Sequence, residues 1–308
     1  MPANRKILVT GGTGTIARPV VEHLARDNEV WCAGRFGDAA AKAELQAMGV
    51  RTCMWDMDAE DWSQLPADFT HVFHAAMDFG PALAEHDRAI RLAAEATGLL
   101  MQHCRTAEAF VFVSTFCVYR RQGMAADHPY AETDPLGCDV SYSASYPMSK
   151  IAAEGAVRAA ARMLGLRTTI ARMNVGYGGM GGNGGLPVTY YRMMAAGQPI
   201  AVSAGADELC SPIAARDIAR QSDALFGMAS VPATIVNWAG DETVSRRELC
   251  EYIGELTGVA PVFVESPAWI ELYASDNRRR RTLMGDCTVR WRDGLRELFA
   301  TRRDILAA

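Results

Sequence analysis

The first half of the chain alternates short apolar runs with longer amphipathic segments. Apolar and β-branched runs predict strands at residues 7–9, 30–33, 51–55, 71–75, 109–114 and 167–171. Between them, apolar positions recur at helical spacing, which predicts helices at 16–24, 39–48, 82–105 and 149–164. Strands that alternate with helices indicate a parallel sheet with right-handed crossovers, so we expect an α/β, Rossmann-type doubly wound fold.

The pattern changes after residue 172. Residues 176–185 contain seven glycines, a backbone too permissive for a helix or a strand. We expect this stretch to be a mobile lid over the site or a plain surface loop. Residues 1–172 should form the cofactor-binding domain, with a returning strand and helix near 213–238. A smaller C-terminal substrate-binding part would then consist of residues 173–212 and 239–308.

Composition excludes several classes of function. The 308 residues carry 36 acidic and 31 basic side chains, a net charge of −5, which disfavours nucleic acid as a partner. No apolar run reaches the roughly 18 residues of a membrane span. The first strand begins so early that we expect no signal peptide and a cytoplasmic protein. Eight scattered cysteines without a Cys-x-x-Cys pair predict neither a zinc site nor a disulfide framework.

A glycine-rich turn between the first strand and the first helix predicts a dinucleotide site. Gly11 would allow the tight turn, and Gly14 would let the backbone approach a pyrophosphate. The backbone amides of Thr15 and Ile16, at the start of the helix, would face the phosphates.

The end of the second strand bears on which cofactor binds. NAD sites usually carry an acidic residue here, whereas this strand ends at Gly34 and Arg35. Because a guanidinium suits a 2′-phosphate, we expect NADP, with NAD as the alternative. Farther along, Asp56 could accept a hydrogen bond from the adenine amino group or be an ordinary turn residue.

A tyrosine and a lysine four residues apart suggest acid–base chemistry. Tyr146 and Lys150 would share one face at the start of a helix, and the chain has only three lysines. An ordinary phenol has a pKa near 10, and a nearby lysine cation would lower it. Lys150 could also donate to the nicotinamide ribose. Ser114 and Thr115 end a central strand, at the sheet edge where ligands bind, and could hold a substrate oxygen.

Together these motifs resemble the extended short-chain dehydrogenase/reductase family, in its epimerase/dehydratase-like branch. The resemblance rests on the glycine turn, residues 72–76, Ser114 and Thr115 ahead of Val118 and Tyr119, the Tyr146–Lys150 pair, and segments at 172–178, 212–219 and 245–249. It implies that Tyr146 is the acid/base, Lys150 its modulator and ribose ligand, and Thr115 the ligand of the substrate oxygen.

The same resemblance implies further contacts. Met57 would join the cofactor site, and Ala75 and Ala76 would line the nicotinamide pocket. Met77, Asn174 and Ser114 would lie on the substrate side. It also implies a homodimer formed through the helices at 82–105 and 149–164, and a small-molecule substrate.

Departures from the family pattern narrow the activity. Dehydratases of this branch carry an Asp-Glu pair after the catalytic threonine, and here Phe116 and Cys117 argue against dehydration. Acidic and neutral residues at 207–211 and 265–267 stand where sugar-nucleotide enzymes carry arginines. We therefore expect an NADP(H)-dependent carbonyl reductase or alcohol dehydrogenase for a small or moderately apolar substrate. The alternative is a sugar-nucleotide 4-epimerase. A third possibility, a non-enzymatic NADP-sensing regulator, would not need Tyr146 and Lys150.

Overall fold

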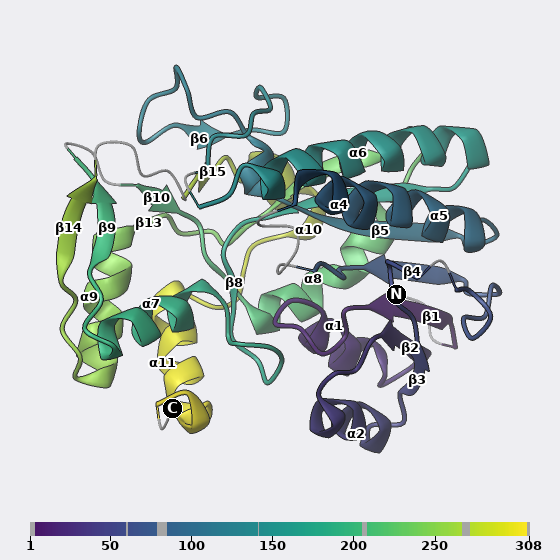
Figure 1. Cartoon of the computed structure of the whole chain (residues 1–308), viewed down its shortest axis with the longest axis horizontal. Helices are drawn as coiled ribbons and strands as arrows, with labels where there is room; N and C mark the ends of the chain where they lie inside the picture. Colours follow the sequence, from purple (N-terminus) through teal and green to yellow (C-terminus); the bar gives the residue numbers. More distant parts are fainter. Residues whose placement is uncertain are drawn as a thin grey trace.

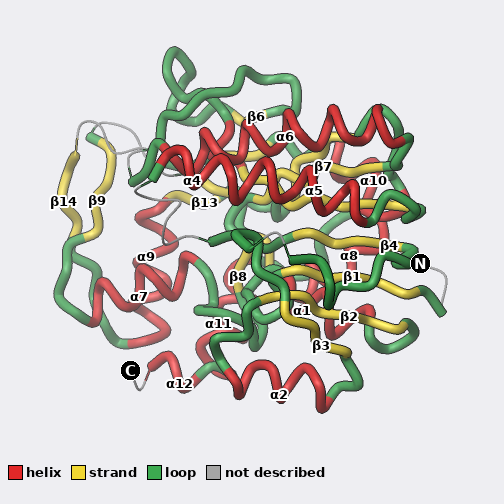
Figure 2. Tube along the Cα trace, turned by 45° about the vertical axis from the view of Figure 1, so that its right-hand side comes forward, coloured by secondary structure: helices red, strands yellow, loops and turns green. Residues whose placement is uncertain are grey.

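A seven-stranded parallel sheet forms the centre of the molecule (Figures 1 and 2). The computed structural model describes residues 4–59, 61–78, 85–140, 142–204, 208–266 and 272–306. The strand order is β12-β7-β5-β4-β1-β2-β3. The strands are β1 (Lys6–Thr10), β2 (Glu29–Gly34), β3 (Arg51–Met54), β4 (His71–His74), β5 (Ala109–Thr115), β7 (Thr168–Met173) and β12 (Thr234–Trp238). The chain changes direction across the sheet between β1 and β4, which opens a crevice at the carboxyl ends of these strands. The expected fold class is confirmed.

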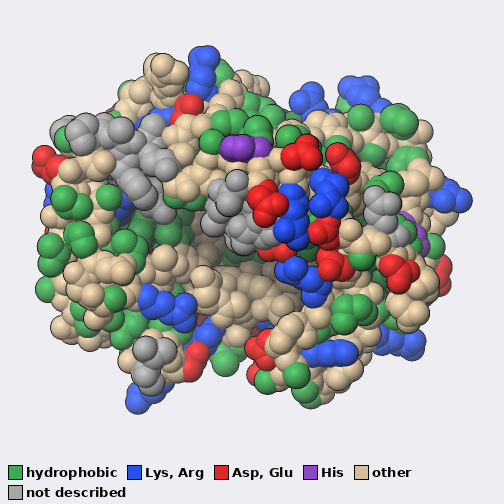
Figure 3. Space-filling view, viewed as in Figure 1, with side chains coloured by type: hydrophobic (Ala, Val, Ile, Leu, Met, Phe, Trp, Pro, Cys, Tyr) green, Lys and Arg blue, Asp and Glu red, His purple; other side chains and the backbone are tan. Residues whose placement is uncertain are grey.

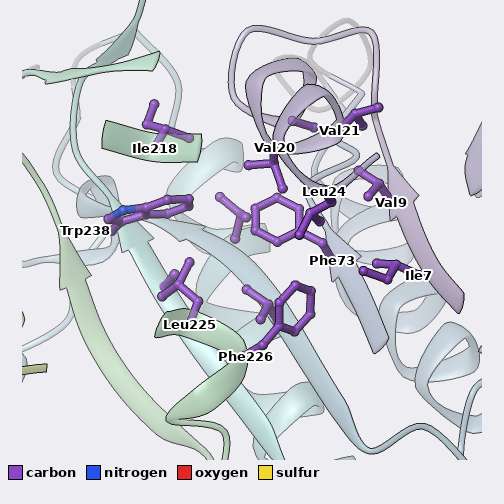
Figure 4. Close-up of a cluster of buried hydrophobic side chains, with 14 of the residues drawn as sticks. Ile7, Val9, Val20, Val21, Leu24, Phe73, Ile218, Leu225, Phe226 and Trp238 are labelled. Atoms are coloured by element: carbon purple, nitrogen blue, oxygen red, sulfur yellow. The ribbon is translucent and has the colours of Figure 1, made fainter. Parts of the chain in front are cut away.

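Helices cover both faces of the sheet. One face packs against α1 (Ala17–Leu24), α2 (Ala39–Ala47) and α8 (Ala215–Gly227). The other face packs against α5 (Ala96–His103) and α6 (Ser145–Leu164). In β1, Ile7 and Val9 enter the first core and Leu8 enters the second, which explains why the strands are continuously apolar. Figure 4 shows α1 and α8 side chains meeting Phe73 and Trp238 over the sheet.

Two predicted helices differ from the observed ones. The helix expected at 82–105 consists of α4 (His86–Ile90), a π-helical turn η1 (Arg91–Glu95) and α5, while residues 82–84 lie outside the described part. The helix expected to start at residue 149 starts at Ser145. As a result, Tyr146 lies within the first turn of α6 rather than ahead of it.

Within the described residues, the second part of the molecule, at the left of Figure 1, consists of short paired strands and four helices. The pairs are β6 (Pro129–Tyr130) with β15 (Ala274–Ser275), β8 (Gly176–Tyr177) with β11 (Ile213–Ala214), β9 (Ile200–Ser203) with β14 (Phe263–Ser266), and β10 (Leu209–Cys210) with β13 (Val244–Ser245). The helices are α7 (Leu186–Ala195), α9 (Arg246–Thr257), α11 (Trp291–Thr301) and α12 (Arg303–Leu306). The short strand pairs join segments that are far apart in the sequence.

The sheet domain also includes segments from the second half of the chain, among them the stretch 213–238 where a returning strand and helix were expected. The structure places α8 and β12 in the sheet domain, beside β7. It also places α10 (Arg278–Met284), from the stretch assigned to the substrate side, against α8 and β12.

The glycine-rich stretch is neither a free loop nor entirely without regular structure. Its first two residues form β8, so the expectation of no strand is wrong there. Residues 178–185, which we call the glycine strap, lie against the cofactor turn. The Gly182 amide donates to the Thr13 carbonyl at 2.8 Å, and the Thr15 hydroxyl donates to the Gly181 carbonyl at 3.3 Å. A Cβ on Gly181 would lie 2.6 Å from the Gly14 carbonyl oxygen, so only glycine permits this approach.

Candidate active site

A cavity of about 810 Å³ opens at the carboxyl edge of the sheet, where the two parts of the molecule meet. Figure 3 shows a hollow at the centre of this face. Its walls include the cofactor turn, the ends of β4 and β5, the start of α6, the glycine strap and residues 272–273. The cavity therefore lies at the topological switch point, where ligands bind in doubly wound folds.

The glycine turn fits a pyrophosphate. Gly11 has a φ of +71°, and a Cβ there would lie 3.0 Å from the Ala76 backbone. The first helix, α1, has no side-chain cap at Ile16, and of its first amides that of Arg18 donates to the Gly14 carbonyl at 2.9 Å. The amides ahead of Arg18 can therefore face an anion. Thr15 and Ile16, both expected at the cofactor site, line the cavity.

A buried histidine holds the floor of the cavity in place. The Thr10 hydroxyl accepts hydrogen bonds from the amides of Ala75 (3.2 Å) and Ala76 (3.1 Å) and lies 2.7 Å from His74 Nδ1. His74 Nε2 lies 2.9 Å from the Thr97 hydroxyl, which itself donates to a backbone carbonyl. Nε2 is therefore the donor and Nδ1 the acceptor. Burial lowers the pKa of His74 to about 3, so the imidazole is neutral. Its hydrogen bond with Thr10 links β4 to β1.

A second cavity, of about 230 Å³, adjoins the glycine turn at the end of β2. Arg35, Asp56, Met57 and Met77 line it, and Met77 also lines the larger cavity. The Arg35 guanidinium lies 2.8 Å from the Asp78 carboxylate, with 58% of its side chain exposed. Asp56 Oδ1 accepts a bond from the Asp58 amide at 3.0 Å, as in a turn. The residues expected at the adenosine end of the cofactor thus line this second cavity.

The Tyr146–Lys150 pair belongs to the wall of the larger cavity. Both side chains are buried, and both line the cavity. Lys150 Nζ donates to the Val113 carbonyl at 3.0 Å. Burial lowers the pKa of Lys150 to about 8, against the opposing effect of Glu154. The ammonium is thus held at the end of β5 and is easily deprotonated for a lysine.

The phenol of Tyr146 differs from the expectation of a lowered pKa. Burial raises the pKa of Tyr146, Cys117 adds to this, and a hydrogen bond with Thr115 opposes it. The dominant cause is desolvation, which disfavours the phenolate. At neutral pH Tyr146 therefore holds its proton, as a general acid must before it acts. Tyr142, which sequence reasoning missed, stands 6.3 Å from the Tyr146 ring, and its hydroxyl lies 3.2 Å from the Cys117 sulfur.

The two hydroxyls at the end of β5 have different surroundings. Thr115 lies beside Tyr146, as expected of a ligand for the substrate oxygen. The Ser114 hydroxyl donates to Glu154 at 2.6 Å, and Glu154 forms a double hydrogen bond with Arg172 at 2.9 and 2.7 Å. Successive strand residues point to opposite faces. The Ser114 hydroxyl is therefore bound to the buried Glu154–Arg172 ion pair, whereas the Thr115 hydroxyl lies on the side of Tyr146.

Asn174, expected on the substrate side, lines the cavity, but its side-chain amide is hydrogen-bonded to backbone groups of the protein. Its Nδ2 donates to the Tyr273 carbonyl at 2.8 Å. Its Oδ1 accepts bonds from the Val175 and Ser211 amides at 2.8 and 3.1 Å. Asn174 thus ties the far wall of the cavity to β7.

Other kinds of site find no support in the part of the chain that the structure describes. No group of three or more His, Cys, Asp or Glu side chains there could hold a metal ion. None of the described helices has the length and apolarity needed to cross a bilayer. All eight cysteines are free thiols.

Comparisons with known proteins agree with this geometry. Residues 7–237 match the NAD dependent epimerase/dehydratase family. Pal from Bacillus thuringiensis has a similar structure (TM-score 0.80, 22% identity, 97% of this chain and 99% of that chain). UDP-glucose 4-epimerase from Thermotoga maritima, solved with UDP-glucose, gives a TM-score of 0.79, 19% identity and coverage of 98% and 99%. MoeE5, solved with UDP-glucose and NAD, has a TM-score of 0.78 and 23% identity, and the match covers 97% of this chain and 99% of that chain. No curated protein matches the sequence.

The family match spans most of the chain and includes the glycine turn, Thr115, Tyr146 and Lys150. It confirms the resemblance expected from the sequence, and with it an enzyme that uses an NAD(P) cofactor. The structural neighbours, all below 25% identity, add the fold. This chain belongs to the NAD dependent epimerase/dehydratase family.

Proposed function

We propose that this protein is an NAD(P)-dependent epimerase that oxidises a secondary alcohol and reduces the resulting ketone from the opposite face. One observation carries the proposal: a single cavity joins the glycine turn to Thr115, Tyr146 and Lys150. The family to which the chain belongs supports it, and Phe116 and Cys117 in place of an acidic pair speak against dehydration.

The side chains divide the chemistry between them. Tyr146 is protonated at neutral pH, so it must first lose that proton to solvent, which the Lys150 ammonium favours. The phenolate then takes the proton of the substrate hydroxyl as the carbonyl forms, and the resulting phenol returns it as the carbonyl is reduced. Thr115, which hydrogen-bonds Tyr146, also donates to the substrate oxygen and fixes its position. A nicotinamide cofactor, held by the glycine turn, would supply the hydride acceptor and donor when bound. Lys150 holds its charge near the phenol and is within reach of a cofactor ribose. Acid–base catalysis of this kind contributes about 10²–10⁴-fold.

Two substrate classes follow from different observations. The sugar-nucleotide 4-epimerases among the structural neighbours support a sugar-type substrate. The apolar lining of the cavity, which includes Phe116, Met173, Leu186 and Leu272, supports a second candidate function, net reduction of an uncharged carbonyl compound. The two activities share the same catalytic residues and differ in whether the cofactor is consumed.

We propose NADP as the preferred cofactor, with NAD as the alternative. Arg35 is the side chain at the adenosine cavity that could pair with a 2′-phosphate, by exchanging Asp78 for it. Asp38, an acidic residue at the same cavity, uses its carboxylate to cap α2 by accepting from the Ala40 and Ala41 amides. Both capping bonds go to Asp38 Oδ1.

The test follows the fate of the cofactor. The purified protein is incubated with NADP or NAD and, separately, with UDP-glucose or with uncharged secondary alcohols that carry a second stereocentre, and the epimerised product is sought by chromatography. In parallel, NADPH oxidation is recorded with a panel of ketones. Epimerisation without net cofactor change supports the first candidate, and stoichiometric NADPH consumption supports the second. Tyr146→Phe should abolish either activity and leave cofactor affinity nearly unchanged, and wild-type rates in this variant would refute the assignment.

A further inference from the structure

The larger cavity is nearly devoid of charge. Among the described residues that line it, Lys150 alone carries a charged side chain. Its Nζ is bonded to the Val113 carbonyl, at the cofactor end. The parts of the chain outside the described residues contain no lysine or arginine at all. No cation can therefore reach the substrate end of the cavity from those segments.

Three arginines close to the substrate end bind other groups of the protein. Arg172 is buried in its double hydrogen bond with Glu154. Arg246 is buried against Glu208. Arg121 donates to the carbonyls of Ala126 and Leu272, at 2.8 and 3.5 Å. Away from the glycine turn, a diphosphate or carboxylate at the substrate end of the cavity would lose its solvation without an ion pair to any of these three arginines, which is unfavourable.

One polar group at the substrate end has no partner within the described structure. Tyr273 lines the cavity and is 2% exposed, yet its hydroxyl meets no hydrogen-bond partner among the described residues. Its ring is fixed by an edge contact with Tyr130, with centroids 5.2 Å apart. A buried hydroxyl without a partner costs stability, and proteins keep such groups where a ligand satisfies them.

We propose that the substrate is an uncharged hydroxy or keto compound whose second polar atom binds the Tyr273 hydroxyl, and that nucleoside diphosphates are excluded from this site. The inference rests on the proposed function, since it names the substrate class for the same cavity. Tyr146 and Thr115 hydrogen-bond to the reacting oxygen, and the Tyr273 hydroxyl hydrogen-bonds to a second oxygen of the same molecule. Tyr273 is a specificity residue and takes no part in the hydride step.

The first test compares charged and uncharged probes on the cofactor-loaded protein. Titration calorimetry with UDP and UDP-glucose should detect no binding. In turnover assays, ethyl 3-oxobutanoate and other ketoesters are paired with their free acids, which share the same reacting carbonyl. We expect the esters to exceed the acids by at least about 100-fold in kcat/KM. Binding of UDP-glucose, or equal use of ester and acid, would overturn the inference.

The second test isolates the Tyr273 hydroxyl with two matched variants. Tyr273→Phe removes a hydroxyl without a partner, whereas Tyr119→Phe removes one that donates to Asn237 at 2.5 Å. We expect Tyr273→Phe to keep or raise Tm and to raise KM about tenfold with little change in kcat. Tyr119→Phe should lower Tm and leave KM unchanged. A lowered Tm and an unchanged KM in Tyr273→Phe would assign the hydroxyl a structural role and refute the proposal.

The outcomes separate this inference from the function on which it rests. If the protein binds NADPH but turns over no member of any ester–acid pair and no UDP-sugar, the proposed function fails. The UDP titration then decides the inference alone, because binding of the nucleotide does not require hydride transfer.

Discussion

The contact between the glycine strap and the cofactor turn makes a prediction about how firmly the cofactor is held. Gly182 lines the same cavity as Gly14, Thr15 and Ile16, and its amide is bonded to Thr13. The strap thus covers the turn on which a pyrophosphate would rest. The perturbation is Gly182→Ala, which adds one methyl group at a φ of +57°.

The magnitude follows from two structural terms. A left-handed conformation costs an alanine about 1–2 kcal/mol. In addition, the new Cβ would lie 2.6 Å from Thr15 Oγ1 and 2.7 Å from Thr15 N, and the second of these atoms cannot move without the cofactor turn. We expect the strap to be displaced instead, with loss of the bond to Thr13, worth about 1 kcal/mol. Together these terms give about 2–3 kcal/mol, which corresponds to a roughly 30- to 140-fold faster release of the cofactor.

The assay is stopped-flow release of NADPH, with fluorescence detection and an excess of unlabelled cofactor as a trap. Gly197→Ala is the matched control, because Gly197 has a φ of +68° and nothing within 4 Å of the added Cβ. It shares the backbone strain but not the contact. Equal release rates in the two variants would refute the idea that the strap retains the cofactor.

Three further predictions concern charge. Arg35→Ala should weaken NADPH binding by about 10- to 100-fold and leave NADH binding unchanged in fluorescence titrations, because only the 2′-phosphate meets the guanidinium. Arg172→Met should lower the free energy of unfolding in urea by about 3–5 kcal/mol, since Glu154 is left charged and buried; adding Glu154→Leu should recover much of the loss. The pKa of Lys150 falls from 10.5 to about 8 on folding, so between these values the unfolded chain binds a proton that the folded chain does not, and stability rises with pH. Relative to Lys150→Met, the cofactor-free wild type should gain about 2 kcal/mol in free energy of unfolding between about pH 7 and about pH 9.5, and a flat difference would contradict the shifted pKa.

The strands and the cofactor turn were predictable because their signals are local. Buried parallel strands are continuously apolar, and a glycine turn between a strand and a helix has few other uses. The boundaries of the helices were less predictable from the sequence. The early start of α6 at Ser145 and the π-helical turn at Arg91–Glu95 depend on packing between helices, which periodicity does not record.

The site was predictable in composition but only partly in geometry. Ser114 and Thr115 are neighbours in sequence, and the alternation of the strand alone separates their roles. Asn174 has the right place, but its amide is taken by backbone groups brought in from β15 and its surroundings. Tyr273 carried no sequence signal, since it follows no motif and reaches the cavity only through the pairing of β15 with β6.

The division of the cavity between two kinds of framework has a consequence for how new activities arise. The wall of the cavity that carries the cofactor turn, Thr115, Tyr146 and Lys150 belongs to the domain of the seven-stranded sheet. Most substitutions there, such as those at the His74–Thr10 hydrogen bond, would disturb folding. The opposite wall is carried by strand pairs only two residues long, at β8–β11 and β6–β15. Residues such as Leu186, Thr189, Leu272 and Tyr273 can therefore be exchanged with little effect on hydride transfer. The fold thereby separates evolvability from catalysis, and a library confined to that wall is the natural starting point for redirecting the enzyme to another alcohol.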